Sequence, residues 1–156
     1  MNFSFPGLTY GSISFNDYLG KVILVVNTAS KCGFTGQYAG LEQLYRDKYH
    51  DGLVIIGVPS NDFGGQEPED EAGIDQFCQK NFGVTFPMTA KQHVKGPGAH
   101  PFYAYAAHHC GWIGKPKWNF HKYLINRRGG LVDYFHSSTK PDSPKLLAAI
   151  EKELRR

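Results

Sequence analysis

Among the residues of this sequence, Cys32 has the surroundings that most favour a reactive side chain. It lies five residues beyond the apolar run 22–27 and shortly before the segment 37–50, which has helical periodicity. A thiol between the carboxyl end of a strand and the N-terminus of a helix is close to the positive end of the helix dipole and to unpaired backbone N–H groups, which favour the thiolate. The alternative interpretation, a small buried apolar side chain, fits poorly with the polar, glycine-containing segment 30–33. The sequence therefore predicts a reactive thiol.

The other two cysteines do not form a recognisable redox or metal-binding motif with Cys32. Three cysteines at irregular spacing form neither a disulfide framework nor a C-x-x-C pair. Cys110 follows His108 and His109, and both residue types bind zinc. Adjacent histidines diverge on a helix, however, and no second cluster supplies the remaining ligands. We expect a surface thiol at Cys110 and no metal.

Two buried strands with a helix between them are expected to position Cys32. The runs 22–27 and 53–58 are continuously apolar and rich in β-branched residues, which is typical of strands covered on both faces. Parallel pairing of these strands needs a crossover, which the segment 37–50 supplies, with Thr35 as its N-cap and an apolar face that reaches Tyr49. Cys32 would then lie at the carboxyl ends of parallel strands, where ligands commonly bind.

The remaining elements complete a three-layer α/β sandwich with a mixed central sheet. They are an N-terminal hairpin around 6–11, a helix over 70–81, a short helix over 100–109, a hairpin within 120–135 and a closing helix over 143–155. With 156 residues in all, we expect a single domain over 1–156.

The composition excludes several classes of function. The net charge of +3 is too small and too little clustered to indicate a nucleic-acid partner. There is no apolar run of about 18 residues that would span a membrane, and the N-terminus lacks the pattern of a signal peptide. We expect a soluble, cytoplasmic protein, or a periplasmic one if a leader was removed.

Four separated segments resemble the successive signatures of the glutathione peroxidase family, in the same order. They are 27–35 (NTASKCGFT), 57–68 (GVPSNDFGGQEP), 83–88 (GVTFPM) and 118–124 (WNFHKYL). Four motifs spread over nearly the whole chain are far more specific than one short pattern. The resemblance implies a thioredoxin-like fold and a peroxidase that reduces hydrogen peroxide and organic hydroperoxides to water and alcohol.

The resemblance also assigns the site residues. It makes Cys32 the peroxidatic cysteine, at the position where some animal members carry selenocysteine, and it makes Gln66, Trp118 and Asn119 its partners. Their carboxamide and indole N–H groups are neutral donors, which solvate a thiolate without forming an ion pair. Taken singly, these three residues have ordinary alternatives as a loop residue, a core tryptophan and a turn asparagine. Their joint occurrence with Cys32 favours the site.

The implied chemistry is attack of the Cys32 thiolate on a peroxide oxygen, which gives a sulfenic acid without a metal or organic cofactor. No residue is identified as the proton donor to the leaving oxygen, and a water relay stays open. The sulfenic acid is reduced back to the thiol by glutathione or by a thioredoxin-type protein. We favour the thioredoxin-type protein. Two rival functions also stay open: a redox sensor that passes its oxidation to a partner, and a non-catalytic thioredoxin-like binding module.

Cys78 is the candidate resolving cysteine. Plant and yeast members of the family carry theirs one position later, where this chain has Gln79. On a helix, Cys78 lies on the buried apolar face with Ile74 and Phe77. The alternative is therefore that Cys78 is a core side chain without a redox role. The short segment 112–118 lacks the insertion that tetrameric relatives use for assembly, which implies a monomer with an open site that admits bulky hydroperoxides.

Overall fold

A four-stranded mixed sheet forms the centre of the computed structural model, which describes residues 2–156. The strand order is β4–β3–β5–β6, with bounds β3 (Val22–Thr28), β4 (Leu53–Pro59), β5 (Lys122–Ile125) and β6 (Leu131–Phe135). β3 pairs with β4 in parallel and with β5 antiparallel, and β5 pairs antiparallel with β6. The predicted mixed sheet, its central parallel pair and the C-terminal hairpin are therefore confirmed.

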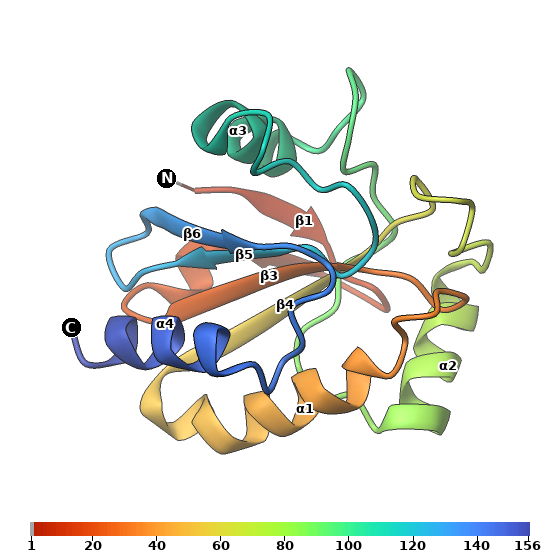
Figure 1. Ribbon diagram of the computed structural model, residues 1–156. Coiled ribbons are helices and arrows are strands. Elements are labelled where there is room, and N and C mark those ends of the chain that lie inside the picture. Colours follow the sequence, from red (N-terminus) through yellow and green to blue (C-terminus); the bar gives the residue numbers. More distant parts are fainter. Residues whose placement is uncertain (1) are drawn as a thin grey trace.

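Helices cover both faces of the sheet (Figure 1). Their bounds are α1 (Gln37–Lys48), α2 (Glu71–Phe82), α3 (Pro101–Cys110) and α4 (Pro144–Leu154). One apolar core joins the sheet to α1, α2 and α4, and a second joins it to α3 and to the N-terminal hairpin, β1 (Ser4–Pro6) and β2 (Ser12–Ser14). Every residue of β3 and β4 is buried, because each strand has an apolar layer on both sides.

Helix α1 begins at Gln37 as predicted, but its predicted N-cap was wrong by one position. Thr35 does not cap the helix, because Gly36 precedes it with helical dihedral angles (φ −55°, ψ −20°) and no side chain caps the end. The loop before it is itself turned, since the Thr35 N–H donates to the Cys32 carbonyl over 3.1 Å. The apolar face also ends earlier than predicted, because Tyr49 lies in a 3₁₀ turn and is half exposed.

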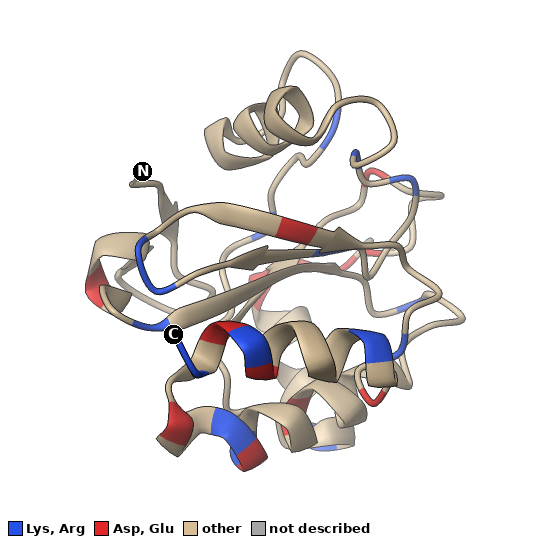
Figure 2. Cartoon of the chain, turned by 60° about the vertical axis from the view of Figure 1, so that its left-hand side comes forward, with Lys and Arg blue, Asp and Glu red and all other residues tan. Residues whose placement is uncertain are grey.

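The remaining helix boundaries lie within one or two residues of their predicted positions. Asp70 caps α2 by accepting a hydrogen bond from the Gly73 N–H, and Gly83 ends the helix in the left-handed region at φ 56°. Acidic and basic residues lie among uncharged ones on α1 and α4 (Figure 2). Lys48 of α1 pairs with Glu151 of α4 across this surface. No helix within residues 2–156 has the length and hydrophobicity that crossing a bilayer requires.

Candidate active site

Cys32 lies in a tight loop between β3 and α1. Its thiol is free, and the residue is only 4% exposed. Its Sγ accepts a hydrogen bond from the backbone N–H of Phe34 over 3.3 Å. The loop therefore places an unpaired backbone N–H on the sulfur, as expected at the start of a helix. Phe34 could not be predicted as the donor from the sequence, because nearly every residue type has a backbone N–H.

A second loop, which follows β4, lies against the Cys32 loop. The Lys31 N–H donates to the Gln66 carbonyl over 2.8 Å, and the Ser30 hydroxyl donates to Glu67 Oε1 over the same distance. Gly64 and Gly65 both have positive φ, which few other residues tolerate, and they turn the chain toward Gln66. These contacts fix Gln66 beside the peptide that precedes Cys32.

The third segment enters β5 and carries Trp118 and Asn119. Asn119 is fully buried, and its Nδ2 donates to Gln66 Oε1 over 3.1 Å and more weakly to the Phe63 carbonyl over 3.5 Å. Trp118 packs over the second loop, since a Cβ placed on Gly64 would lie 2.8 Å from the Trp118 ring. The structure thus brings these residues together with Gln66 from separate parts of the chain.

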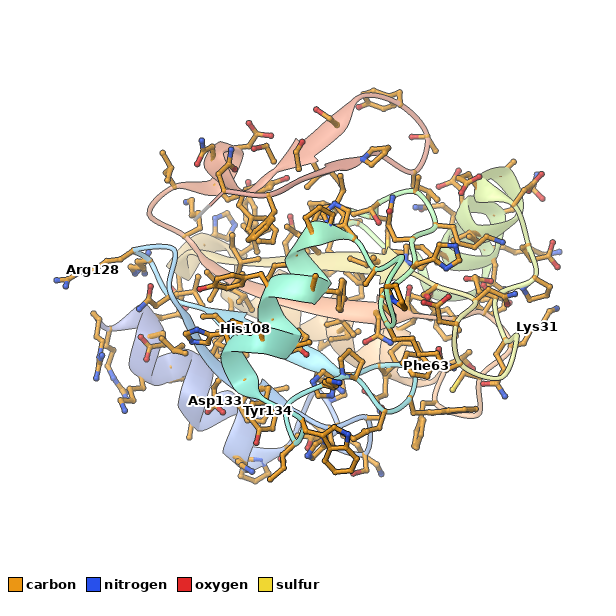
Figure 3. The ribbon with its side chains drawn as sticks, turned by 90° about the horizontal axis from the view of Figure 1, so that it is seen from above. Lys31, Phe63, His108, Arg128, Asp133 and Tyr134 are labelled. Atoms are coloured by element: carbon orange, nitrogen blue, oxygen red, sulfur yellow. The ribbon has the colours of Figure 1, made fainter. Side chains whose placement is uncertain are left out.

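The contacts refine the predicted cage of donors. Asn119 donates to the Gln66 side chain, and in the part of the chain that the structure describes no hydrogen bond joins it to Cys32 Sγ. Because Gln66 accepts this bond through its oxygen, its Nε2 group remains free to donate. Within residues 2–156, the hydrogen bond to Cys32 Sγ comes from Phe34. Lys31, which directly precedes Cys32, is exposed at the surface (Figure 3).

Cys78 and Cys110 have different surroundings. Cys78 is 1% exposed in α2, and burial raises the pKa of its thiol to about 11. It belongs to the same apolar core as Cys32, on the inward stripe that the sequence indicated. Cys110 ends α3 and is half-buried rather than fully at the surface, which raises its pKa as well. No group of three metal-ligating side chains occurs within residues 2–156.

Buried ionisable residues that the sequence analysis missed lie close to the site. Glu67 is fully buried, and burial raises the pKa of its carboxyl group above its usual range. Lys122 and His121, at the start of β5, are also almost completely buried. Their position in a motif next to Asn119 was visible in the sequence, but their burial depends on the packing of both faces of the sheet.

An open groove begins beside the Cys32 loop. It has a volume of about 570 Å³ and runs from Gly33 and Phe34, along α1, to the segment 138–142. Part of its wall is apolar, with Leu44, Pro141 and Leu147. The groove therefore reaches the residues that follow Cys32, while the loop of Gln66, Trp118 and Asn119 adjoins the peptide that precedes it.

The mixed sheet with helices on both faces and a cysteine after its first central strand defines a thioredoxin-like fold. The apo crystal structure of Trgpx matches it with a TM-score of 0.78 at 37% identity, covering 99% of this chain and 94% of that one. The glutathione peroxidase family model matches residues 2–107. The chain belongs to the glutathione peroxidase family.

Relatives of known name agree with this assignment. The glutathione peroxidase-like peroxiredoxin gpx1 of Schizosaccharomyces pombe is 51% identical over 131 residues, which is 82% of each chain. The hydroperoxy fatty acid reductase gpx1 of Synechocystis is 42% identical over 160 residues, covering 97% of this chain and 94% of the relative. The chain is a thiol-dependent peroxidase, as the sequence motifs predicted.

Proposed function

We propose that Cys32 is the thiol that reduces the peroxide, and that Gln66, Trp118 and Asn119 complete its site. The observation that carries the proposal is that the Gln66 loop joins the Cys32 loop to the segment of Trp118 and Asn119. The Gln66 carbonyl accepts a hydrogen bond from the Lys31 N–H, and the Gln66 side-chain oxygen accepts one from the Asn119 amide. Cys32 itself receives the Phe34 N–H. Donors held in place before the reaction stabilise developing charge without reorganising.

In the proposed reaction, the Cys32 thiolate attacks one oxygen of the hydroperoxide. The new S–O bond forms as the O–O bond breaks, so the sulfur is oxidised to sulfenic acid and the peroxide is reduced. The other oxygen leaves as hydroxide or alkoxide and takes a proton from water, giving water or alcohol. The thiol and the peroxide exchange both electrons, so the proposed reaction uses no metal or organic cofactor.

Each partner has a distinct task in this proposal. The Phe34 N–H stabilises negative charge on the sulfur before and during the attack. The free Nε2 group of Gln66 and the Trp118 indole donate to the peroxide and to the departing oxygen. Asn119 holds the Gln66 carboxamide in the orientation that leaves Nε2 available. Positioning of this kind contributes through both orientation and electrostatics.

We propose that a thioredoxin-type protein recycles the enzyme, with glutathione as the alternative reductant. If Cys78 is the resolving thiol, α2 must open before a disulfide forms, because Cys78 is buried in the helix and its pKa is raised to about 11. Oxidising the protein with one equivalent of peroxide and mapping its disulfides distinguishes the routes. A Cys32–Cys78 bridge supports internal resolution, whereas a mixed disulfide of Cys32 with added glutathione supports the direct route.

We also propose that the enzyme accepts bulky organic hydroperoxides. The groove beside the Cys32 loop has apolar walls on which a hydrocarbon chain can lie, and the Synechocystis relative is named a hydroperoxy fatty acid reductase. The test compares kcat/KM for hydrogen peroxide and for a fatty acid hydroperoxide with the same reductant. Similar values support the proposal, and strict rejection of the large substrate contradicts it.

The proposed working form is a monomer in the cytoplasm, where thiol reductants are available. The exposed Trp112 and Ile113 in the segment 111–117 stay accessible in a monomer. Sedimentation at increasing protein concentration tests the monomer, which a concentration-independent mass of one chain would support. Cell fractionation tests the compartment, and recovery in the periplasm would contradict it.

A further inference from the structure

A buried lysine lies beneath the segment that carries Trp118 and Asn119. Lys122 is 0% exposed, although it is the first residue of a strand only four residues long. Because strand side chains alternate, it shares the face of Leu124, which belongs to the core on the side of α1 and α4. Within residues 2–156, no carboxylate forms a salt bridge with it. A buried ammonium group without a counter-ion is costly.

Neutral oxygens from two elements receive this ammonium group. Lys122 Nζ donates to the Phe120 carbonyl over 2.6 Å and to Gln37 Oε1 over 2.7 Å. Gln37 is the first residue of α1, and its Nε2 donates in turn to the Ser137 carbonyl over 2.7 Å. The lysine therefore joins the entrance of β5 to the start of the helix that follows the Cys32 loop.

The backbone of Phe120 shows what this connection holds. Phe120 is the one non-glycine residue with positive φ, 65°, within residues 2–156. An aromatic residue in this region is strained, because its Cβ crowds the carbonyl oxygen that follows. Its N–H donates to the Asn27 carbonyl over 2.6 Å, while its own carbonyl accepts from Lys122. Asn27 also donates through Nδ2 to the Trp118 carbonyl. The left-handed turn is thus held on both sides.

We propose that Lys122 is a positioning residue of the peroxidase site. It keeps Phe120 in its left-handed conformation, and this turn sets where Trp118 and Asn119 lie relative to Gln66. Through Gln37 it also ties that turn to the first residue of α1. This inference rests on the proposed function, since it assigns Lys122 a task in the reaction of Cys32.

The energetics distinguish positioning from simple support of the fold. Burial lowers the pKa of Lys122 to about 7, so the charged form is disfavoured inside the protein. Replacing Lys122 by methionine removes this cost, although it leaves Gln37 Oε1 and the Phe120 carbonyl without their donor. If Lys122 served stability alone, any loss of rate in the variant would come with a lower Tm and unchanged surroundings of Trp118, whereas loss of a positioning residue slows the reaction and changes those surroundings without lowering the Tm.

The test uses Lys122→Met, with Lys152→Met on the exposed surface of α4 as the matched control. Both are made in a Trp112→Phe background, which leaves Trp118 as the one tryptophan of the chain. Stopped-flow fluorescence then reports the rate of Cys32 oxidation by hydrogen peroxide, and acrylamide quenching reports the surroundings of Trp118. For Lys122→Met we expect a rate at least about tenfold lower, altered Trp118 quenching and an unchanged or higher Tm.

A rate within twofold of the control would overturn the proposal, and so would a rate loss that is accompanied by a lower Tm and unchanged Trp118 quenching. Should Lys122→Met fail to fold, Gln37→Met removes one of the two acceptors of the Lys122 ammonium group. In Gln37→Met we expect a smaller loss of oxidation rate and a smaller change in Trp118 quenching. An unchanged rate and unchanged quenching in Gln37→Met would overturn the link to α1. If Cys32 of the parent protein does not react with peroxide, the proposed function fails by itself, while Trp118 quenching still tests the positioning.

Discussion

Cys32 and Cys78 are both buried thiols in the same apolar core, yet their chemical settings differ. Cys32 is 4% exposed and Cys78 is 1% exposed. Cys32 lies in a loop, where the Phe34 N–H is free to donate to its sulfur. Cys78 lies inside α2, whose backbone N–H groups are used within the helix, and burial raises its pKa to about 11. Burial therefore raises the pKa of the Cys78 thiol although the Tyr38 hydroxyl acts in the opposite direction, whereas the Cys32 loop directs a backbone N–H at its sulfur.

The largest expected effect is at Cys32 itself. Cys32→Ser should reduce peroxide consumption by about a thousandfold or more, because a hydroxyl group cannot replace the thiolate as nucleophile. Cys78→Ser is the matched control, and a single round of Cys32 oxidation in it should proceed within about twofold of the parent rate. Consumption of peroxide with an excess of small thiol measures the first effect. Retained activity in Cys32→Ser would contradict the assignment.

The second effect concerns the accessibility of Cys78. A pKa of about 11 leaves about one part in 10⁴ of the thiol ionised at pH 7. In a Cys32→Ser, Cys110→Ser variant, we expect iodoacetamide to alkylate Cys78 at least about a hundredfold more slowly in the native state than in urea. Mass spectrometry of quenched samples gives both rates. Equal rates would show that α2 opens freely, and the contrast between the two thiols would not hold.

The third prediction separates the tasks of Gln66 and Asn119. Gln66→Leu should slow oxidation of Cys32 by about a hundredfold, at the lower end of the range for loss of one donor in an active site, because the Phe34 N–H stays on the sulfur. Asn119→Leu should have a smaller effect, because Asn119 acts through Gln66. The double variant should then be no slower than Gln66→Leu. Additive losses, measured by stopped-flow fluorescence, would mean that Asn119 contacts the reacting atoms independently.

A smaller effect tests whether burial also controls titration on the other face of the sheet. Burial lowers the pKa of His121 to about 3, with the neighbouring His136 acting in the same direction. Between this value and the unfolded pKa of about 6.5, the unfolded chain binds the proton and the folded one does not. Stability is therefore lost as the pH falls below about 6.5.

Replacing His121 by a residue that does not titrate should remove this loss of stability at low pH. Compared with the parent, His121→Phe should gain up to about 1.4 kcal/mol in free energy of unfolding for each pH unit between about 6 and 4. Urea unfolding of both proteins at several pH values measures the difference, with His50→Phe at an exposed position as the control. A difference that does not change with pH would show that His121 titrates normally.

The sequence predicted the parts of this structure that depend on short-range patterns. The apolar runs identified β3 and β4, and turn and capping residues located the helices to within one or two residues. The assignment of Cys32, Gln66, Trp118 and Asn119 came from the motifs, and the structure brings the last three into one neighbourhood. The error at Thr35 arose because the Cys32 loop is already turned before the helix begins.

The remaining features could not be predicted because they depend on backbone direction and tertiary packing. The donor on Cys32 is a backbone N–H, which every residue except proline possesses. The order of donation from Asn119 to Gln66 depends on how two distant loops meet. Lys122 follows an ordinary charged pattern in the sequence, and only the layers on each face of β5 reveal that its ammonium group is buried.

The most direct test of the account is to identify which thiol reacts first with peroxide. The native protein, with all three cysteines reduced, receives less than one equivalent of hydrogen peroxide in the presence of dimedone, and the labelled peptides are quantified by mass spectrometry. We expect the label on Cys32, with Cys78 and Cys110 unmodified. Label on Cys78 or Cys110 with Cys32 still reduced would contradict the assignment of Cys32.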